Sequence, residues 1–219
     1  MSAFYNVAPE NKLRVIAPDV GGGFGSKIFI YPEEIVCLWA SKRTGVPVKW
    51  VADRTESFMT DAHGRDHVTE VEMAFDKDNR ITALKVDTIA NFGAYMSLFS
   101  SSVPTYLYAT LLSGQYNIPA IHANVRAVYT NTSPVDAYRG AGRPEATYVL
   151  ERTMETAARE LGVSPAELRR KNFVTQFPHQ TPVIMAYDAG DYAASLDAAM
   201  KAADYAGFSE RKKAAAKKG

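Results

Sequence analysis

The pattern of apolar and polar positions predicts strands in the first half of the chain and helices in the second. Residues 13–20 form a short apolar run that predicts a buried strand, and this run leads directly into the glycine-rich stretch Gly21–Lys27. A helix is predicted over residues 32–43, with Gly45 just past its end. The β-branched residues in 46–53 predict a second strand.

Further along, the period of the pattern changes to two. Residues 68–75 alternate between apolar and acidic side chains, residues 76–80 have turn chemistry, and residues 81–90 return as a partner strand. This pattern predicts an antiparallel hairpin with one face toward water. Residues 123–129 predict another strand, whereas the aromatic stretch 92–116 has no clear period and stays unassigned.

The second half has helical spacing. Pro144 is placed to open a helix that Gly162 ends, and its predicted buried face consists of Val149, Leu150, Met154 and Leu161. Ser164 and Glu167 have the spacing of a capping box at the start of a short helix. Asp191 is predicted to cap a third helix that reaches about Ala206.

These elements predict a mixed α/β protein of α+β arrangement, in which a mixed sheet with an antiparallel hairpin packs against helices. We expect one domain over residues 1–207, with two lobes at about 1–135 and 136–207. The basic stretch 208–219 has no apolar stripe and is predicted to be a flexible, solvated tail rather than a contact for nucleic acid.

Composition removes several classes of function. The net charge of +1 gives no electrostatic reason to expect a nucleic-acid or anionic-membrane partner, and no apolar run is long enough to cross a bilayer. Cys37 is the single cysteine, which excludes an internal disulfide or an iron–sulfur cluster held by this chain alone, and its neighbours predict a core position. The start of the sequence lacks the layout of a signal peptide, so the predicted compartment is the cytoplasm.

The glycine run suggests an anion site. Consecutive glycines let bare N–H groups approach an anion, although a tight turn is an equally ordinary interpretation. A dinucleotide-binding loop is a rival hypothesis, because Asp53 could bind a ribose. Against this hypothesis, Ser26 occupies the third glycine position, Asp53 lies too far along the chain, and the hairpin breaks the alternating order of strands and helices.

A second loop, residues 136–144, places Arg139 and Arg143 around a flexible glycine segment that leads into a helix N-terminus. Fixed guanidinium groups and free N–H groups suit an anion, a phosphate or a metal-oxo oxygen. The alternative is that both arginines pair with surface acids such as Glu145, and the loop alone does not decide between these interpretations.

Together the two loops resemble a known family. The stretch from Val15 to Lys27 is similar to the first molybdopterin-contacting loop of the xanthine dehydrogenase/aldehyde oxidase family, and the stretch from Ala137 to Ala146 is similar to its active-site loop. Tyr116–Pro119 and the later stretch from Glu160 to Phe173 also match in order and spacing.

The resemblance implies a molybdenum hydroxylase that takes oxygen from water and passes electrons through iron–sulfur clusters to a flavin. It implies molybdopterin, in the cytosine dinucleotide form, as cofactor. FAD and 2Fe–2S clusters would lie on partner subunits, a medium and a small one, and the rest of the molybdenum subunit would be a further partner. The cofactor-binding residues implied are Gly22, Gly23, Phe24, Gly25, Arg139 and Gly140. Phe24 and Arg139 would lie near the molybdenum, and no residue here would ligate the metal directly.

Departures from the family pattern narrow the implied substrate. Ile28, Leu107 and Ala141 stand where purine-oxidising members carry an acid, an arginine and a phenylalanine. The resemblance therefore disfavours xanthine as the substrate and implies that these three residues line the substrate channel. Gly140 stands where carbon monoxide dehydrogenases carry a copper-binding cysteine, as in the second form of those large chains. The implied substrate is an aldehyde or an N-heterocycle.

The resemblance also implies that this chain is a fragment. Family members are several times longer, and the loop with the general-base glutamate would lie in a missing C-terminal part, so no catalytic residue is assigned here and the chain alone is expected to be inactive. The alternatives are a non-catalytic remnant without cofactor and, less favoured, a dinucleotide-binding domain. His63 and His67 are predicted to be loop histidines rather than metal ligands.

Overall fold

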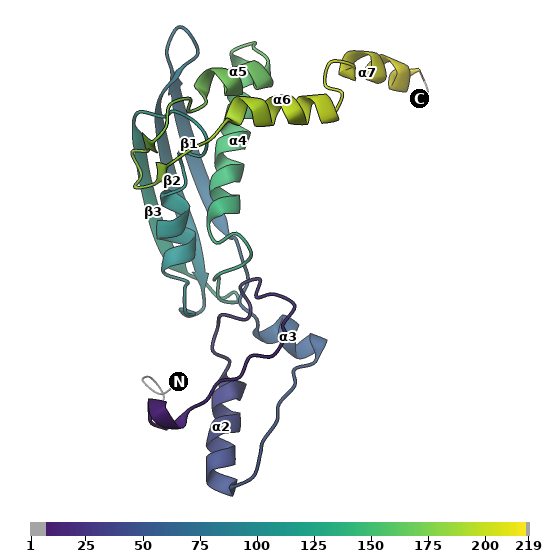
Figure 1. Ribbon diagram of the computed structural model, residues 1–219. Coiled ribbons are helices and arrows are strands. Elements are labelled where there is room, and N and C mark those ends of the chain that lie inside the picture. The colour runs from purple at the N-terminus through teal and green to yellow at the C-terminus, as the bar shows by residue number, and fades with distance from the viewer. Residues whose placement is uncertain (1–7, 218–219) are drawn as a thin grey trace. The chain divides into compact units, whose positions relative to one another are not determined.

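The computed structural model describes residues 8–217, and the chain divides into two compact units that are each built from several stretches of sequence. Unit 1 comprises Met1–His67, Ala90–Tyr106 and Ala127–Ala141, and unit 2 comprises Val68–Ile89, Leu107–Arg126 and Gly142–Gly219. The division therefore does not follow a single cut near residue 135. Figure 1 labels the helices and strands of both units.

Unit 1 begins with irregular chain and two helices. After a 3-10 turn, η1 (Glu10–Lys12), come α2 (Pro32–Thr44) and α3 (Arg54–Thr60). Helix α2 confirms the predicted helix: proline occupies its first turn, and Gly45 ends it in the left-handed conformation at φ 74°. Cys37 is half-buried on α2 rather than in a closed core.

Helix α3 was not predicted, although its start carries a recognisable signal. The side chain of Asp53 accepts from the backbone N–H of Glu56 at 2.8 Å, and the Glu56 carboxylate accepts from the N–H of Asp53 at 2.8 Å. This reciprocal pair is a capping box. Asp53 therefore begins a helix and does not end a strand.

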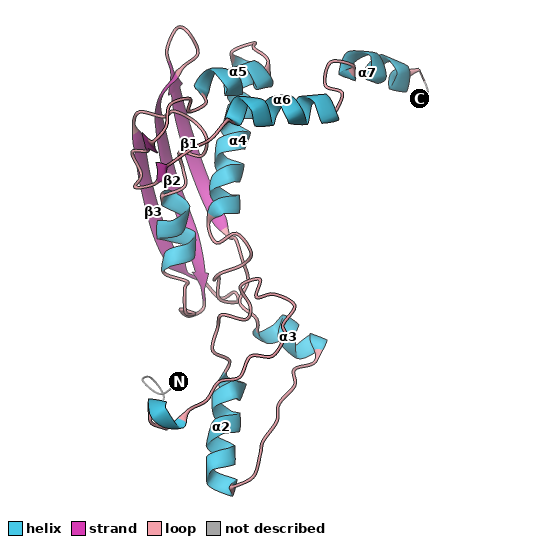
Figure 2. Ribbon diagram, viewed as in Figure 1, coloured by secondary structure: helices cyan, strands magenta, loops and turns pink. Residues whose placement is uncertain are grey.

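Two predicted strands are wrong. Residues 13–20 and 46–53 lie outside any strand, and Figure 2 draws these stretches as loop. Their β-branched composition favours strands, but a strand needs a hydrogen-bonded neighbour, and the described residues offer none to either segment. Without a strand ahead of the glycine run, the dinucleotide-binding hypothesis loses its structural basis.

The main sheet confirms the predicted hairpin. Its order is β1 (His67–Phe75), β2 (Ile81–Gly93) and β3 (Ile121–Tyr129). The turn between β1 and β2 is closed by the N–H of Asp76 donating to the carbonyl of Arg80 at 2.9 Å. Alternate residues of β1 are exposed, as the one-sided pattern predicted. The unassigned stretch contains a π-helical segment, Ser102–Leu107.

The hydrophobic core lies in unit 2, where α4 (Arg143–Glu160) packs its buried face on the sheet. That face consists of Ala146, Val149, Leu150, Met154 and Ala158. It meets side chains such as Leu84 and Val86 from β2 and the buried rings of Tyr108 and Tyr116. Leu161, predicted to be buried, is instead 40% exposed, because the helix has ended and Gly162 turns the chain at φ 67°.

Helix α5 (Pro165–Asn172) follows at once, as predicted, but without the capping box: the Ser164 side chain makes no capping hydrogen bond. The helix is held at its other end, where the Asn172 side chain accepts from the N–H of Ile81 at 2.8 Å and donates to the carbonyl of Asn79 at 3.0 Å. Asn172 therefore ties α5 to the hairpin.

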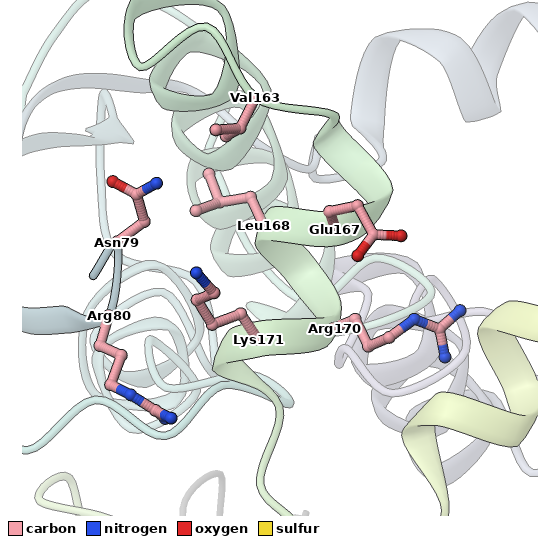
Figure 3. Close-up of a pocket in the computed structure, with 7 residues that line it drawn as sticks. All are labelled: Asn79, Arg80, Val163, Glu167, Leu168, Arg170 and Lys171. Atoms are coloured by element: carbon pink, nitrogen blue, oxygen red, sulfur yellow. The ribbon is translucent and has the colours of Figure 1, made fainter.

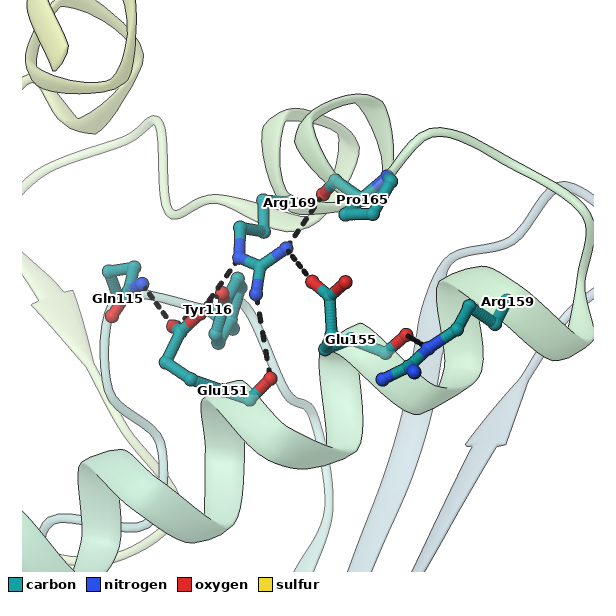
Figure 4. A network of polar contacts seen from close by, with 7 residues as sticks. All are labelled: Gln115, Tyr116, Glu151, Glu155, Arg159, Pro165 and Arg169. Carbon is teal, nitrogen blue, oxygen red and sulfur yellow. Dashed lines mark hydrogen bonds and ion pairs between the residues drawn. The ribbon is translucent and has the colours of Figure 1, made fainter. Parts of the chain in front are cut away.

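A polar network connects α4 to α5 (Figure 4). The Glu151 carboxylate accepts from the hydroxyl of Tyr116 at 2.7 Å, from the amide of Gln115 at 2.8 Å and from the Nε of Arg169 at 2.8 Å. Burial, and then the hydrogen bond to Glu151, raise the pKa of Tyr116 well above its usual range. The network therefore joins the buried Tyr116 to half-buried charged groups that satisfy one another's hydrogen bonds.

The chain then forms the short antiparallel pair β4 (His179–Gln180) and β5 (Ala186–Tyr187), followed by α6 (Tyr192–Ala202) and α7 (Phe208–Ala216). The Asp191 side chain caps α6 by accepting from the N–H of Ala194 at 2.9 Å, as predicted, although the helix ends before Ala206. Helix α7 occupies the basic end and has no buried residue. No helix among the described residues is long and apolar enough to cross a membrane.

Candidate functional site

The glycine loop of unit 1 is a turn with a reversed backbone. Gly22 and Gly25 have φ of 101° and 99°, and Phe24 between them adopts the left-handed conformation at φ 54°. A non-glycine residue in this region is uncommon and costs about 1 kcal/mol or more, so the loop holds Phe24 in a defined orientation. The ring lies so close to Gly22 that a Cβ there would be 2.5 Å from it.

The backbone N–H groups of this loop are available. Within residues 8–217, none of the N–H groups of Gly22, Gly23, Phe24 or Gly25 donates to a backbone carbonyl. Gly23 is also open on its side-chain side, with nothing within 4 Å of where a Cβ would be. Several free N–H groups on a glycine backbone form a suitable cradle for an anionic group.

The second loop, residues 136–144, also depends on left-handed residues at its centre. Gly140, Ala141 and Gly142 have φ of 115°, 44° and 89° in succession. Such a run lets the chain reverse before α4 begins, and alanine rather than glycine at its centre adds local strain. Arg139, just before this run, is exposed, and its guanidinium forms no ion pair within the described chain.

The two loops meet inside unit 1. The N–H of Arg139 donates to the carbonyl of Phe24 at 3.1 Å, and the Arg139 guanidinium lies 5.5 Å from the centre of the Phe24 ring. A Cβ at Gly25 would lie 2.7 Å from the carbonyl carbon of Ala137, so only glycine permits this approach. The structure therefore brings together the two residues predicted to flank one centre.

A buried carboxylate supports the second loop. Asp136 is 1% exposed, and its Oδ2 accepts from the N–H of Phe99 at 2.9 Å while its Oδ1 accepts from the N–H of Ala137 at 2.5 Å. Its own N–H donates to the carbonyl of His63 at 2.8 Å. The sequence placed Asp136 at the start of the second loop but assigned it no role, because its burial could not be inferred from the pattern.

On its outer side the second loop contacts Arg65. The Arg65 guanidinium donates to the carbonyl of Arg139 and lies 4.7 Å from the centre of the Tyr138 ring. Tyr138 also lines a pocket of about 240 Å³ together with α3 residues and the segment 61–64. His63 therefore accepts a hydrogen bond through its backbone carbonyl and lines this pocket. No cluster of three or more metal-ligating side chains is found in residues 8–217.

The predicted channel residues are only partly placed. Ile28 is 47% exposed at the end of the glycine loop, and Ala141 belongs to the second loop, both in unit 1. Leu107 is half-buried at the end of the π-helical segment and belongs to unit 2. Their role in a substrate channel stays a prediction.

Another pocket, of about 330 Å³, lies in unit 2 beside α5 (Figure 3). Its wall includes Arg80, Arg170 and Lys171, but Arg170 pairs with Asp197 at 2.5 Å and Lys171 donates to the carbonyl of Asp78 at 2.8 Å. None of the predicted site residues lines it. The two loops of unit 1 therefore remain the candidate site.

Free glycine N–H groups beside an exposed arginine form a site suited to an anionic cofactor, and comparison with known proteins identifies the family. Residues 2–173 match the family of molybdopterin cofactor-binding domains. The chain therefore belongs to the family of molybdopterin cofactor-binding domains, whose relatives are molybdenum-dependent oxidoreductases, and this confirms the resemblance seen in the sequence.

Curated relatives and solved structures agree with this assignment. The carbon monoxide dehydrogenase large chain of Hydrogenophaga pseudoflava is 41% identical over 202 residues, which are 90% of this chain and 25% of that one. The nicotine 6-hydroxylase large subunit of Paenarthrobacter nicotinovorans is 35% identical over 96% of this chain and 26% of its own. Quinoline 2-oxidoreductase from Pseudomonas putida 86 superposes with a TM-score of 0.85 at 35% identity, covering 92% of this chain and 26% of that chain.

The chain spans about a quarter of the length of these relatives. Their similarity confirms the mixed α/β class of a molybdenum-hydroxylase large subunit. The individual cofactor contacts at Gly22, Gly23, Phe24, Gly25, Arg139 and Gly140 stay predictions.

Proposed function

We propose that this chain supplies one wall of the molybdenum centre in the large subunit of a hydroxylase, with its two loops bound to the cofactor. The contact between Phe24 and Arg139 carries the proposal, since it joins the glycine N–H groups and a guanidinium at one place. When bound, the molybdenum cofactor supplies two-electron oxidation of a substrate carbon with oxygen from water.

The donor set fits an anionic cofactor. Free N–H groups at Gly22 and Gly23 suit phosphate or pterin oxygens, and the exposed Arg139 adds a positive charge next to them. Phe24 and Arg139 would orient the cofactor and exclude water from its face, and Gly140 would allow the backbone to approach closely. The general base, a glutamate, would come from another part of the subunit.

The finer assignments belong to the same proposal. We infer the cytosine dinucleotide form of the cofactor, and FAD and 2Fe–2S partner subunits to carry electrons away. An N-heterocycle or an aldehyde is the proposed substrate, because Ile28 and Ala141 offer apolar walls without a charged group to hold a purine. Two relatives named for nicotine and quinoline support the N-heterocycle. A cytoplasmic location stays the expectation drawn from the sequence.

The test is metal and pterin analysis in a host that makes molybdenum cofactor. The chain is produced alone and as a graft that replaces the 202 matched residues of the Hydrogenophaga pseudoflava large chain. We expect molybdenum near one per chain in the graft and none in the isolated chain. The unaltered parent large chain, produced in the same host, is the control and should contain molybdenum. A folded graft without molybdenum would contradict the proposal and favour the alternative, a non-catalytic remnant that binds no cofactor.

A matched pair of variants tests the two site residues in the graft. Phe24 and Phe208 are similarly exposed, at 52% and 56%. The guanidinium of Arg139 lies 5.5 Å from the centre of the Phe24 ring, and that of Arg211 lies 6.0 Å from the centre of the Phe208 ring. Phe24→Ala and Arg139→Gln should each lower the molybdenum content at least about tenfold, equivalent to about 1.4 kcal/mol of binding free energy. Phe208→Ala and Arg211→Gln should leave it unchanged, and equal losses in both pairs would refute a role for the loops.

A further inference from the structure

The N-terminal part of unit 1 has no buried residue. From residue 8 to residue 67 no side chain is buried, although this stretch contains α2 and α3 and many apolar side chains. Five of the six large apolar side chains that are 70% exposed or more lie here: Val15, Ile16, Val51, Phe58 and Met59. So many uncovered apolar side chains in one stretch mark a surface for contact with another part of a protein.

Two segments of this stretch have the composition of strands without a partner. Residues 14–20 and 46–52 are rich in valine, isoleucine and tryptophan, yet within residues 8–217 none of their N–H or carbonyl groups joins a backbone–backbone hydrogen bond. Val15 is 89% exposed and Val51 is 71% exposed. Backbone groups and β-branched side chains that both lack partners are the features of a sheet edge awaiting another strand.

We propose that residues 14–20 and 46–52 are strands that pair with the remaining part of a molybdenum subunit, so that this part covers the exposed apolar side chains. Relatives are about four times as long as this chain, so the partner sequence exists in the proteins it resembles. Between residues 13 and 59 there are six lysines and arginines against five acids, so the surface is neutral and suits an apolar partner rather than a nucleic acid or an anionic membrane.

The position of these segments gives the pairing a consequence for the site. Residues 14–20 lead directly into the glycine loop, so a strand there would fix the orientation of Gly22 and Phe24. The inference rests on the proposed function, because it names the remainder of that same subunit as partner. A second copy of this chain is the competing occupant, and the experiment separates the two.

Hydrogen–deuterium exchange is measured on the isolated chain and on the graft described above. In the isolated chain, the amides of residues 14–20 and 46–52 should exchange within seconds, whereas those of β2 are slow. In the graft, the same amides should slow by about 100-fold or more, because strand hydrogen bonds protect them. Unchanged exchange in a graft with a protected β2 would overturn the proposal, as would concentration-dependent protection in the isolated chain through self-association.

Two isoleucines provide matched variants. Ile16 is 70% exposed and Ile184, in unit 2, is 65% exposed. In the graft, Ile16→Lys should restore fast exchange in residues 14–20, and Ile184→Lys should not. Should the first graft misfold, seen as fast exchange in β2, the same two variants are compared in a second graft, in which this chain replaces the matched residues of the nicotine 6-hydroxylase large subunit.

Molybdenum content of the same samples keeps the two proposals apart. Protected segments without molybdenum would support the strand pairing and refute the proposed function. Molybdenum in a graft whose segments 14–20 and 46–52 are not protected from exchange would support the proposed function and refute the strand pairing.

Discussion

At the scale of single residues, the candidate site depends on backbone conformations that few side chains accept. Phe24 and Ala141 adopt left-handed φ values of 54° and 44°, and glycines stand beside both. Such positions are costly unless neighbouring contacts hold them, so they concentrate at sites where geometry serves function. In this chain the holding contacts are the hydrogen bond from Arg139 to Phe24 and the two bonds accepted by Asp136.

Gly25→Ala should destabilise unit 1 by about 2 kcal/mol or more, because the added methyl meets the Ala137 carbonyl and φ is 99°. Gly23→Ala is the matched control in the same run, since nothing lies within 4 Å of its Cβ and its φ is not left-handed. Urea unfolding of both variants gives the comparison. Equal midpoints would show that the loops do not approach as described.

Asp136→Ala should cost about 2 kcal/mol, because the N–H groups of Phe99 and Ala137 lose their acceptor in a buried setting. Asp136→Asn keeps one acceptor oxygen and should cost about half as much. Denaturant titrations of the two variants provide the measurement. A larger loss for asparagine than for alanine would contradict an acceptor role for this side chain.

At the scale of elements, what the sequence could predict depended on where each element finds its partner. The hairpin of β1 and β2 and the helices α2 and α4 were predictable because their alternation, caps and turns are local. Residues 13–20 and 46–53 have equally strong strand composition but no neighbour to pair with among the described residues, so the pattern alone misled. The same reasoning missed α3, whose capping box was hidden by the apparent strand before it.

For the candidate site, the sequence predicted which residues would gather but not how they are held. The glycine loop and the arginine loop could be recognised from order and spacing, and the structure places Phe24 beside Arg139. The support from Asp136 and Arg65 could not be predicted, because it depends on contacts between residues far apart in the chain.

The contact between α4 and α5 yields a prediction about two neighbouring arginines. Arg169 is 18% exposed and bonds Glu151 within the polar network, whereas Arg170 is 34% exposed and pairs with a more open acid, Asp197. Arg169→Met should therefore cost about 2 kcal/mol, since Glu151 keeps its charge with one cation fewer. Arg170→Met should cost less than about 1 kcal/mol. Thermal unfolding measures the loss of stability in both variants. A larger loss for Arg170→Met than for Arg169→Met would contradict the prediction.

At the scale of the whole molecule, buried side chains are unevenly distributed, and we expect the free energy of unfolding to depend on pH in the alkaline range. The hydrophobic core belongs to unit 2, while residues 8–67 of unit 1 contribute no buried side chain. Burial raises the pKa of Tyr108, Tyr116 and Tyr187 above the ordinary value of 10.0, and burial together with Asp61 does the same for Tyr31. Three of these four tyrosines lie in unit 2.

The raised tyrosine pKa values fix the sign of the pH dependence. Below about pH 10 the tyrosines are neutral in both states and stability does not change on their account. Above that pH the unfolded chain releases phenolic protons that the folded chain retains, so the free energy of unfolding falls as pH rises, by about 1.4 kcal/mol per pH unit for each fully shifted tyrosine. Urea unfolding at pH 8, 9.5, 10.5 and 11 measures this slope.

Two variants test the contribution of Tyr116 to the slope. Tyr116→Phe should make the slope shallower, because it removes the hydroxyl of a fully buried tyrosine. Tyr148→Phe changes a tyrosine that is 70% exposed and should leave the slope unchanged. The same slope in both variants would mean that the Tyr116 hydroxyl is open to water and is not buried in the core of unit 2.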